Sequence, residues 1–159
     1  MKDLQKKVLV LGVGNILLKD DGLGPFVVKE LEESYKSSDV TFLDGGTLGL
    51  DLLAYIEGHS CLLVIDALDV GKEPGSIFCW EGKILDGFSP QVSIHDVGVK
   101  ELLLALHLLD IEIEIVVMGI QMEDISWGME LSESVQKSIP LLKEAVTKRL
   151  NQYLGSDVS

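Results

Sequence analysis

Short apolar runs alternate along the chain with segments in which apolar residues recur every three or four positions. The runs predict strands, because a continuous apolar stretch of about four to eight residues is typical of a strand covered on both faces. The segments with helical spacing predict helices. The predicted strands are 8–11, 40–43, 61–65, 76–80 and 113–118, and the predicted helices are 23–35, 50–56, 94–108 and 133–153.

This alternation of strands and helices predicts an α/β fold. We expect a single-domain, three-layer sandwich with a mostly parallel or mixed five-stranded sheet and helices on both faces. The length of 159 residues fits one domain, and a chain of this size buries about two thirds of its unfolded surface. We expect residues 1–155 to form the domain and residues 156–159 to be a flexible tail.

Two glycines and two adjacent aspartates follow the first predicted strand. Gly12 and Gly14 permit a tight turn, but position 17, where a dinucleotide fingerprint needs its third glycine, is Leu17. Asp20 and Asp21 also place negative charge where a phosphate would meet a helix N-terminus. The loop therefore favours a cation or a hydrogen-bond donor as its ligand. The alternative is that the aspartates only cap the following helix.

Three acidic residues lie at the ends of predicted strands. Asp21 follows the first strand and its turn, Asp44 the second strand and Asp66 the third. Because ligands of open α/β sheets bind beside the carboxyl ends of the strands, we expect these carboxylates to share one crevice. Carboxylates held close together repel one another, so a proton or a metal ion is needed to relieve the repulsion.

A histidine opens one of the predicted helices. Ser93 and Asp96 fit a capping box, which places His95 in the first helical turn, where the helix dipole disfavours the imidazolium ion. A neutral imidazole with the carboxylates of Asp21 and Asp66 is a suitable ligand set for nickel, zinc or another first-row divalent ion. The alternative is that His95 is a polar residue bonded to nearby backbone.

Composition and charge exclude several classes of function. Thirteen Lys and Arg against 26 Asp and Glu give a net charge of −13, which repels nucleic acids and anionic membranes. No apolar run approaches the roughly 20 residues of a membrane span, and no signal-peptide pattern is present; we expect a cytoplasmic protein without membrane insertion. Cys61 and Cys79 lie in separate apolar runs and are expected to be buried free thiols.

Large adaptable side chains are frequent near the last strand. Met118, Met122, Trp127 and Met129 either pack this strand and the following loop or form a flexible contact surface. We expect packing rather than a contact surface.

Five separated motifs resemble those of one protein family. They read GVGNILLKDDGLG, FLDGGTLG, LLVIDAL, SIHDVG, and GIQ with a downstream GMELS, in one order over nearly the whole chain. This combination is similar to the hydrogenase maturation proteases, endopeptidases that trim the C-terminus of the large subunit of nickel-iron hydrogenases. The resemblance implies that the partner is the precursor of such a subunit, and that no organic cofactor is required.

The resemblance also assigns roles to individual residues. It implies that Asp21, Asp66 and His95 bind metal and serve cleavage, and that Asp44 contributes to substrate contact or cleavage. Many relatives carry Glu where this chain has Asp21. The Asp side chain is one methylene shorter than Glu but offers the same carboxylate oxygens. The resemblance further implies that the metal is nickel supplied by the precursor, so that only a loaded subunit is cut. Whether the nickel is a recognition element or a Lewis acid is left open by the sequence.

Two other functions are compatible with parts of the pattern. A non-catalytic nickel-binding or checkpoint module that docks on the large subunit would use the same ligands. A small-molecule or nucleotide-binding α/β domain would share the fold, but it would need the third glycine and no acids beside the phosphates. The zinc-peptidase, phosphate-loop and serine-hydrolase motifs do not occur in the sequence.

Overall fold

The structure is a computed structural model that describes residues 6–46, 52–82 and 97–155. Its elements are β1 (Val8–Val13), the 3₁₀ turn η1 (Lys19–Gly22), α1 (Leu23–Ser34), β2 (Val40–Gly46), α2 (Leu53–Ile56), β3 (Cys61–Leu68), β4 (Ile77–Gly82), α3 (Val97–Leu108), β5 (Glu114–Gln121) and α4 (Glu133–Tyr153). Among these residues the strands form one five-stranded sheet in the order β2-β1-β3-β5-β4. Strands β2, β1, β3 and β5 are parallel, whereas β4 runs antiparallel to β5.

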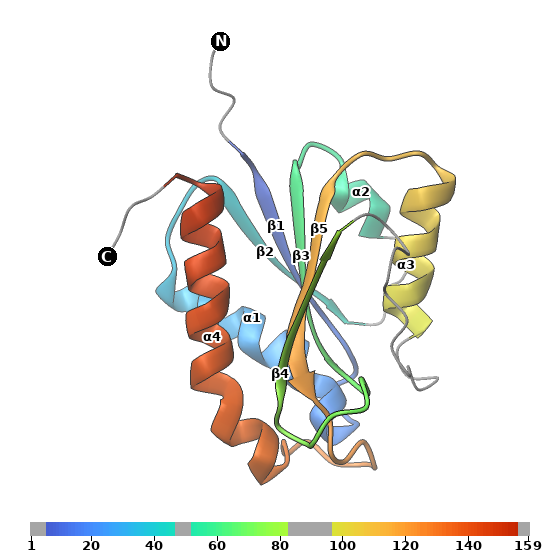
Figure 1. Cartoon of the computed structure of the whole chain (residues 1–159), viewed down its shortest axis with the longest axis vertical. Helices are drawn as coiled ribbons and strands as arrows, with labels where there is room; N and C mark the ends of the chain where they lie inside the picture. Colours follow the sequence, from blue (N-terminus) through green and yellow to red (C-terminus); the bar gives the residue numbers. More distant parts are fainter. Residues whose placement is uncertain (1–5, 47–51, 83–96, 156–159) are drawn as a thin grey trace.

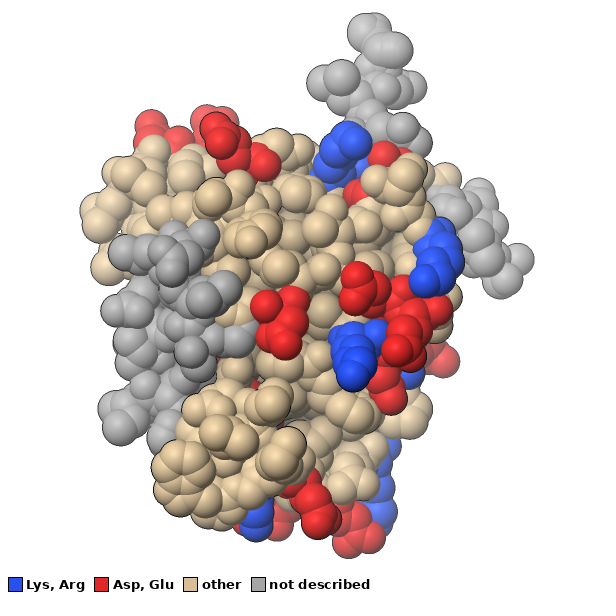
Figure 2. Space-filling model, turned by 180° about the vertical axis from the view of Figure 1, so that it is seen from behind, with Lys and Arg blue, Asp and Glu red and all other residues tan. Residues whose placement is uncertain are grey.

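Helices cover both faces of this sheet, as the sequence predicts. Helices α1 and α4 pack on one face, and α2 and α3 pack on the other (Figure 1). From behind, Figure 2 shows Asp and Glu side chains in separate groups at the upper edge, at the right and at the lower end. Within the described ranges, no helix is long and apolar enough to cross a membrane.

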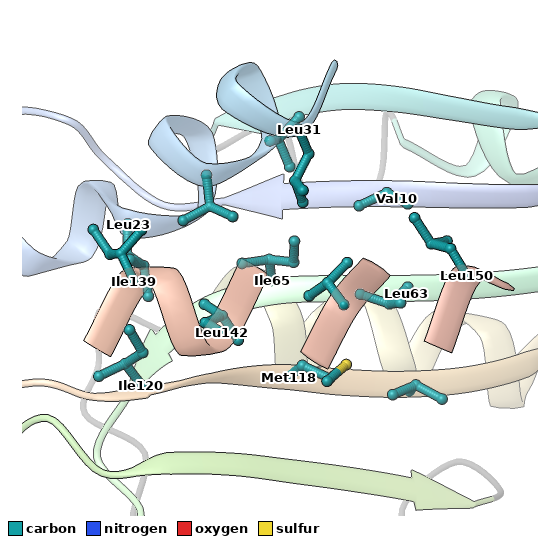
Figure 3. Packing of buried hydrophobic residues seen from close by; sticks show 14 of the residues in the cluster. Val10, Leu23, Leu31, Leu63, Ile65, Met118, Ile120, Ile139, Leu142 and Leu150 are labelled. Carbon is teal, nitrogen blue, oxygen red and sulfur yellow. The ribbon is translucent and has the colours of Figure 1, made fainter. Parts of the chain in front are cut away.

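The sheet divides the apolar interior into two clusters because successive side chains of a strand point to opposite faces. On one side, Val10 and Leu63 pack with Leu142 and Leu150 of α4, and Figure 3 shows these side chains filling the space between helix and sheet. On the other side, residues such as Leu9 pack with the buried residues of α2 and α3. A fully buried side chain of this size contributes about 1.5–3 kcal/mol through the hydrophobic effect.

The predicted helices and strands are largely confirmed, and the main difference lies at the carboxyl ends of the strands. Helix α4 has the predicted bounds, and α1 ends one residue early. Strand β3 continues to Leu68, so the prediction that Asp66 follows the strand is wrong. Asp66 is paired within the sheet with Gly119 of β5, because backbone pairing continues after the apolar run has ended. Residues 94–96, predicted to begin α3, and residues 156–159, the predicted tail, lie outside the described residues.

Two glycines allow helix α1 to begin directly against the sheet. A Cβ on Gly12 would lie 2.3 Å from the carbonyl oxygen of Gly24, and a Cβ on Gly24 would lie 2.4 Å from that of Ile65. Real Cβ atoms do not approach other atoms this closely, so only glycine fits at either position. The close contact places turn η1, which precedes α1, against β3.

The two cysteines differ in exposure. Cys61 is buried in β3, whereas Cys79 is exposed, so the prediction that both are buried is wrong. Cys79 lies on β4, an edge strand of the sheet, and the guanidinium of Arg149 donates to its Sγ at 3.8 Å. Desolvation raises the pKa of both thiols above the usual range.

Candidate active site at the carboxyl end of the sheet

The first predicted site residue, Asp21, is buried in turn η1. Its side chain is 2% exposed, and its Oδ2 accepts a hydrogen bond from the backbone N–H of Asn15 at 2.8 Å. Gly14 has φ +133° and lies so close to Asp21 that a Cβ would meet the Asp21 carbonyl oxygen at 1.8 Å. The N-cap residue of α1 is Gly22, so the alternative that Asp20 or Asp21 caps this helix is wrong.

The second site residue, Asp66, lies near the end of β3. It is 1% exposed, and its Oδ1 accepts a hydrogen bond from the N–H of Ala67 at 2.8 Å. Since Leu62 and Val64 belong to the cluster beneath α2 and α3, strand alternation places the Asp66 side chain on that face. Turn η1 contacts β3. The structure therefore brings Asp21 and Asp66, both buried, to the same end of the sheet.

Asp44 occupies a different environment from the other two carboxylates. It lies in β2, paired with Gly12 of β1, and its side chain is exposed. Phe42 packs with the cluster beneath α1 and α4, so alternation places Asp44 on the face opposite to Asp66. The structure thus brings Asp44 to the same end of the sheet but not to the face that holds Asp66.

The predicted histidine ligand, His95, lies outside the described residues, together with Ser93 and Asp96. The described part of α3 begins at Val97. This helix buries Leu102, Leu103 and Leu106 against the face of the sheet toward which Asp66 points. Within the residues that the structure describes, no group of three or more His, Cys, Asp and Glu side chains is placed to hold a metal ion.

A neighbouring residue, Asp20, has a structural role that the sequence does not reveal. It is completely buried, and within the described residues its carboxylate accepts four hydrogen bonds. Its Oδ2 accepts from the N–H groups of Glu123 and Asp124, both at 2.9 Å, and from the Ser132 hydroxyl at 2.8 Å. Its Oδ1 accepts from the N–H of Ser132 at 2.7 Å. These donors are 103 or more residues away in the sequence. The sequence therefore indicates the unusual position of Asp20 only through the pair of adjacent aspartates.

Asp20 belongs to a set of contacts that joins turn η1 to the loop between β5 and α4. The N–H of Lys19 donates to the carbonyl of Gly128 at 2.8 Å, and that of Asp20 donates to the carbonyl of Asp124 at 3.0 Å. The N–H of Gly128 donates to the carbonyl of Leu17 at 2.9 Å, and the Lys19 ammonium lies 3.1 Å from an Asp124 carboxylate oxygen. Hydrogen bonds from the hydroxyl and N–H of Ser126, with Lys19, lower the pKa of Asp124 to about 2.

The joined loops present large apolar side chains to solvent. Ile16 and Leu17 are 50% and 46% exposed, and Trp127 and Met129 are 78% and 70% exposed. By contrast, Met118 and Met122 are 4% and 9% exposed. Packing, the preferred prediction, is therefore confirmed for these two methionines and wrong for Trp127 and Met129. In Figure 2 a broad uncharged area occupies the lower left of the molecule.

The chain is similar to proteins that are described as hydrogenase maturation proteins. A family model described as "Hydrogenase maturation protease" matches residues 25–149. The hydrogenase expression/formation protein HupD of Rhizobium leguminosarum bv. viciae is 36% identical over 152 residues, which cover 92% of this chain and 75% of that protein. Among solved structures, the hydrogenase maturating endopeptidase HybD of E. coli has a TM-score of 0.82 and 30% identity, covering 92% of this chain and 93% of that chain. The [NiFe] hydrogenase maturation protease HybD of Thermococcus kodakarensis has a TM-score of 0.74 and 30% identity, covering 90% and 98%.

Proposed function

Because this chain belongs to the hydrogenase maturation protease family and is a hydrolase of the endopeptidase type, we propose a specific reaction for it. The enzyme removes a C-terminal peptide from the nickel-loaded precursor of a nickel-iron hydrogenase large subunit. The observation that carries this proposal is the burial of two carboxylates, Asp21 and Asp66, at the same end of the sheet.

Two buried carboxylates at one end of the sheet are suitable ligands for a divalent cation. Burying a carboxylate is costly unless it is paired, hydrogen-bonded or bound to a metal, and a cation offsets the repulsion between two of them. We propose that Asp21, Asp66 and His95 bind the nickel that the precursor already holds. Carboxylate oxygens with one imidazole nitrogen are suitable ligands for a first-row divalent ion. Three protein ligands also leave coordination positions for groups of the precursor.

Recognition of the nickel positions the peptide bond that is cut. Hydrolysis adds water to the scissile carbonyl carbon, breaks the C–N bond and delivers a proton to the leaving amine. A nickel ion beside that carbonyl polarises it or lowers the pKa of a bound water. Asp44 is exposed at the same end of the sheet, which suits a role in contacting the precursor's tail or in cleaving it.

The test compares intact masses of nickel-loaded and nickel-free precursor after incubation with the enzyme. We expect loss of a C-terminal peptide from the loaded form alone, and loss of this activity in the Asp21→Asn, Asp66→Asn and His95→Ala variants. Asp110→Asn is a matched control, because Asp110 is exposed in the turn before β5, at the opposite end of the sheet. Its φ of 57° is one that asparagine adopts readily.

A binding measurement on the same variants separates recognition from catalysis. If a variant binds the loaded precursor normally but cleaves it slowly, the residue acts in the chemical step. If its affinity for the loaded precursor falls to that for the nickel-free form, the residue recognises nickel. Full activity of His95→Ala would remove this histidine from the site, and binding without any mass loss from the wild-type enzyme would contradict the proposed reaction.

A further inference from the structure

We propose that Ile16, Leu17, Trp127 and Met129 form an apolar docking surface for the folded large-subunit precursor, which meets it with apolar side chains flanked by basic ones. This inference rests on the proposed function and concerns how the precursor is held at the same active site. The four side chains are 46% to 78% exposed. An isolated exposed apolar residue is common on proteins, but a group of large ones on adjacent loops indicates an interaction site.

The loops that carry these residues are held rigidly. Leu18 and Gly128 form a parallel β-bridge between the two loops, and the carboxylate of Asp20 accepts two backbone hydrogen bonds from residues 123 and 124. A surface that is ordered before binding loses little conformational entropy when a partner docks. Trp and Met supply large contact areas and are enriched at interfaces. The fixed loops therefore offer a preformed binding surface.

The docking surface extends into a cleft beside the first helix. A cleft of about 420 Å³ is lined by Phe26 of α1, which is 43% exposed, and by Met129 and Leu131 of the loop before α4. This cleft has room for an apolar side chain of the partner, and anchoring side chains in such pockets dominate binding energy.

The docking surface adjoins the proposed active site along the chain. Leu17 lies four positions before Asp21, and the N–H of Asn15 donates to the Asp21 carboxylate. Trp127 and Met129 flank Gly128, whose N–H donates to the Leu17 carbonyl. A folded protein seated on this surface thus has its own tail within reach of Asp21, so the surface fits the body of the substrate.

The charge around the docking surface indicates which side chains the partner presents to it. Glu123 and Glu130 are exposed in the same loop, and the whole chain carries a net charge of −13. Asp124 is paired with the Lys19 ammonium at 3.1 Å, so the negative charge of the rim comes from the two glutamates. A partner with basic side chains around an apolar centre is complementary to this rim. A second copy of this chain would bring two acidic rims together, and the resulting repulsion disfavours self-association through this surface.

The test measures steady-state cleavage of nickel-loaded precursor by Trp127→Ser and Met129→Ser, with Leu108→Ser as the control. Leu108 is 72% exposed, close to the 70% of Met129, but ends α3 at the opposite end of the sheet. We expect KM to rise about tenfold or more for Trp127→Ser, as for truncation of an interface hot spot, with kcat within about twofold. Leu108→Ser should match the wild type.

A second pair of variants tests the charge of the partner. Glu130→Lys should raise KM and weaken precursor binding, whereas Glu57→Lys makes the same charge change on an exposed residue before β3, at the far end of the sheet, and should have little effect. Added salt should weaken binding of the wild-type enzyme and narrow the difference between the two variants, because salt screens exposed charges.

Cleavage and docking are tested by separate measurements. Absence of nickel-dependent cleavage by the wild-type enzyme would refute the function, whereas precursor affinity measured by calorimetry still tests docking. Unchanged KM and affinity in Trp127→Ser would overturn the docking surface, as would a fall in kcat alone. A wild-type dimer in sedimentation experiments that Trp127→Ser dissociates would assign the surface to self-association instead.

Discussion

Replacing Asp20 with asparagine should destabilise the fold strongly, because this buried carboxylate joins two distant loops. The wild-type side chain accepts four hydrogen bonds among the described residues, three at Oδ2 and one at Oδ1. An asparagine has a single acceptor oxygen, and its NH₂ group must occupy the other position. Even in the better orientation, the N–H of Ser132 then faces an amide N–H and loses its acceptor.

The expected loss of unfolding free energy in Asp20→Asn follows from these hydrogen bonds. Leaving one buried donor unsatisfied costs about 1–3 kcal/mol, and three bonds change from charge-assisted to neutral, each a loss of about 1 kcal/mol. The sum is about 4–6 kcal/mol, a large part of the roughly 5–15 kcal/mol that stabilises a typical domain. For a chain of this length, 4 kcal/mol lowers Tm by about 8–16 °C.

The assay is urea unfolding monitored by tryptophan fluorescence, with Asp110→Asn as the matched control. Ser132→Ala removes only the hydroxyl donor and keeps the backbone N–H, so its loss should be about 1 kcal/mol. A loss of less than 1 kcal/mol in Asp20→Asn would refute the reasoning, because it would mean that the carboxylate does not hold the loop between β5 and α4.

Three further predictions address other contacts. Adding a methyl group as Gly119→Ala should destabilise the protein by about 3 kcal/mol or more in thermal unfolding, since the Cβ would lie 1.7 Å from the Asp66 carbonyl oxygen. The pKa of Asp124 is lowered to about 2 in the folded protein. Its stabilising contribution is therefore complete above about pH 4 and is lost as the pH falls toward 2. Asp124→Asn should make the free energy of unfolding less dependent on pH over this range. A thiol-specific aromatic disulfide reagent should label Cys79 and spare the buried Cys61 in the native protein. The reaction should be slow at pH 7 and faster above pH 9, because desolvation raises the pKa of the Cys79 thiol and less thiolate is present at neutral pH.

Each of these expectations has a clear contrary result. Gly119→Ala with wild-type Tm would mean that the strands separate at low cost. An unchanged pH profile in Asp124→Asn would show that other carboxylates control acid unfolding. A mass increase of two labels in the native protein would show that Cys61 is accessible.

The sequence predicts the architecture well because apolar runs and helical spacing reflect burial directly. The order of strands and helices, the mostly parallel sheet and the bounds of α4 follow from the pattern. The ends of strands are less predictable, since the pairing of Asp66 with Gly119 depends on backbone hydrogen bonds that polar residues and glycine also make. The exposure of Cys79 depends on the position of β4 at the edge of the sheet, which no local pattern reveals.

The candidate site is predictable only in part. Asp66 stands out because an acidic residue follows an apolar run, and Asp21 because two aspartates follow the glycine turn after the first strand. Both lie buried at the same end of the sheet. The partners of Asp20 lie in the loop 123–132, so its role depends on tertiary contacts. The exposure of Trp127 also depends on how that loop is held, whereas its apolar character alone favours burial.

The most direct test of the central claim is the intact mass of a large-subunit precursor, loaded with nickel or free of it, after incubation with this enzyme. The account predicts that the loaded precursor alone loses a C-terminal peptide, and that Asp21→Asn and Asp66→Asn leave it uncut. Equal cleavage of the loaded and nickel-free forms, or cleavage that persists in both variants, would contradict the claim that the buried carboxylates recognise the substrate's nickel.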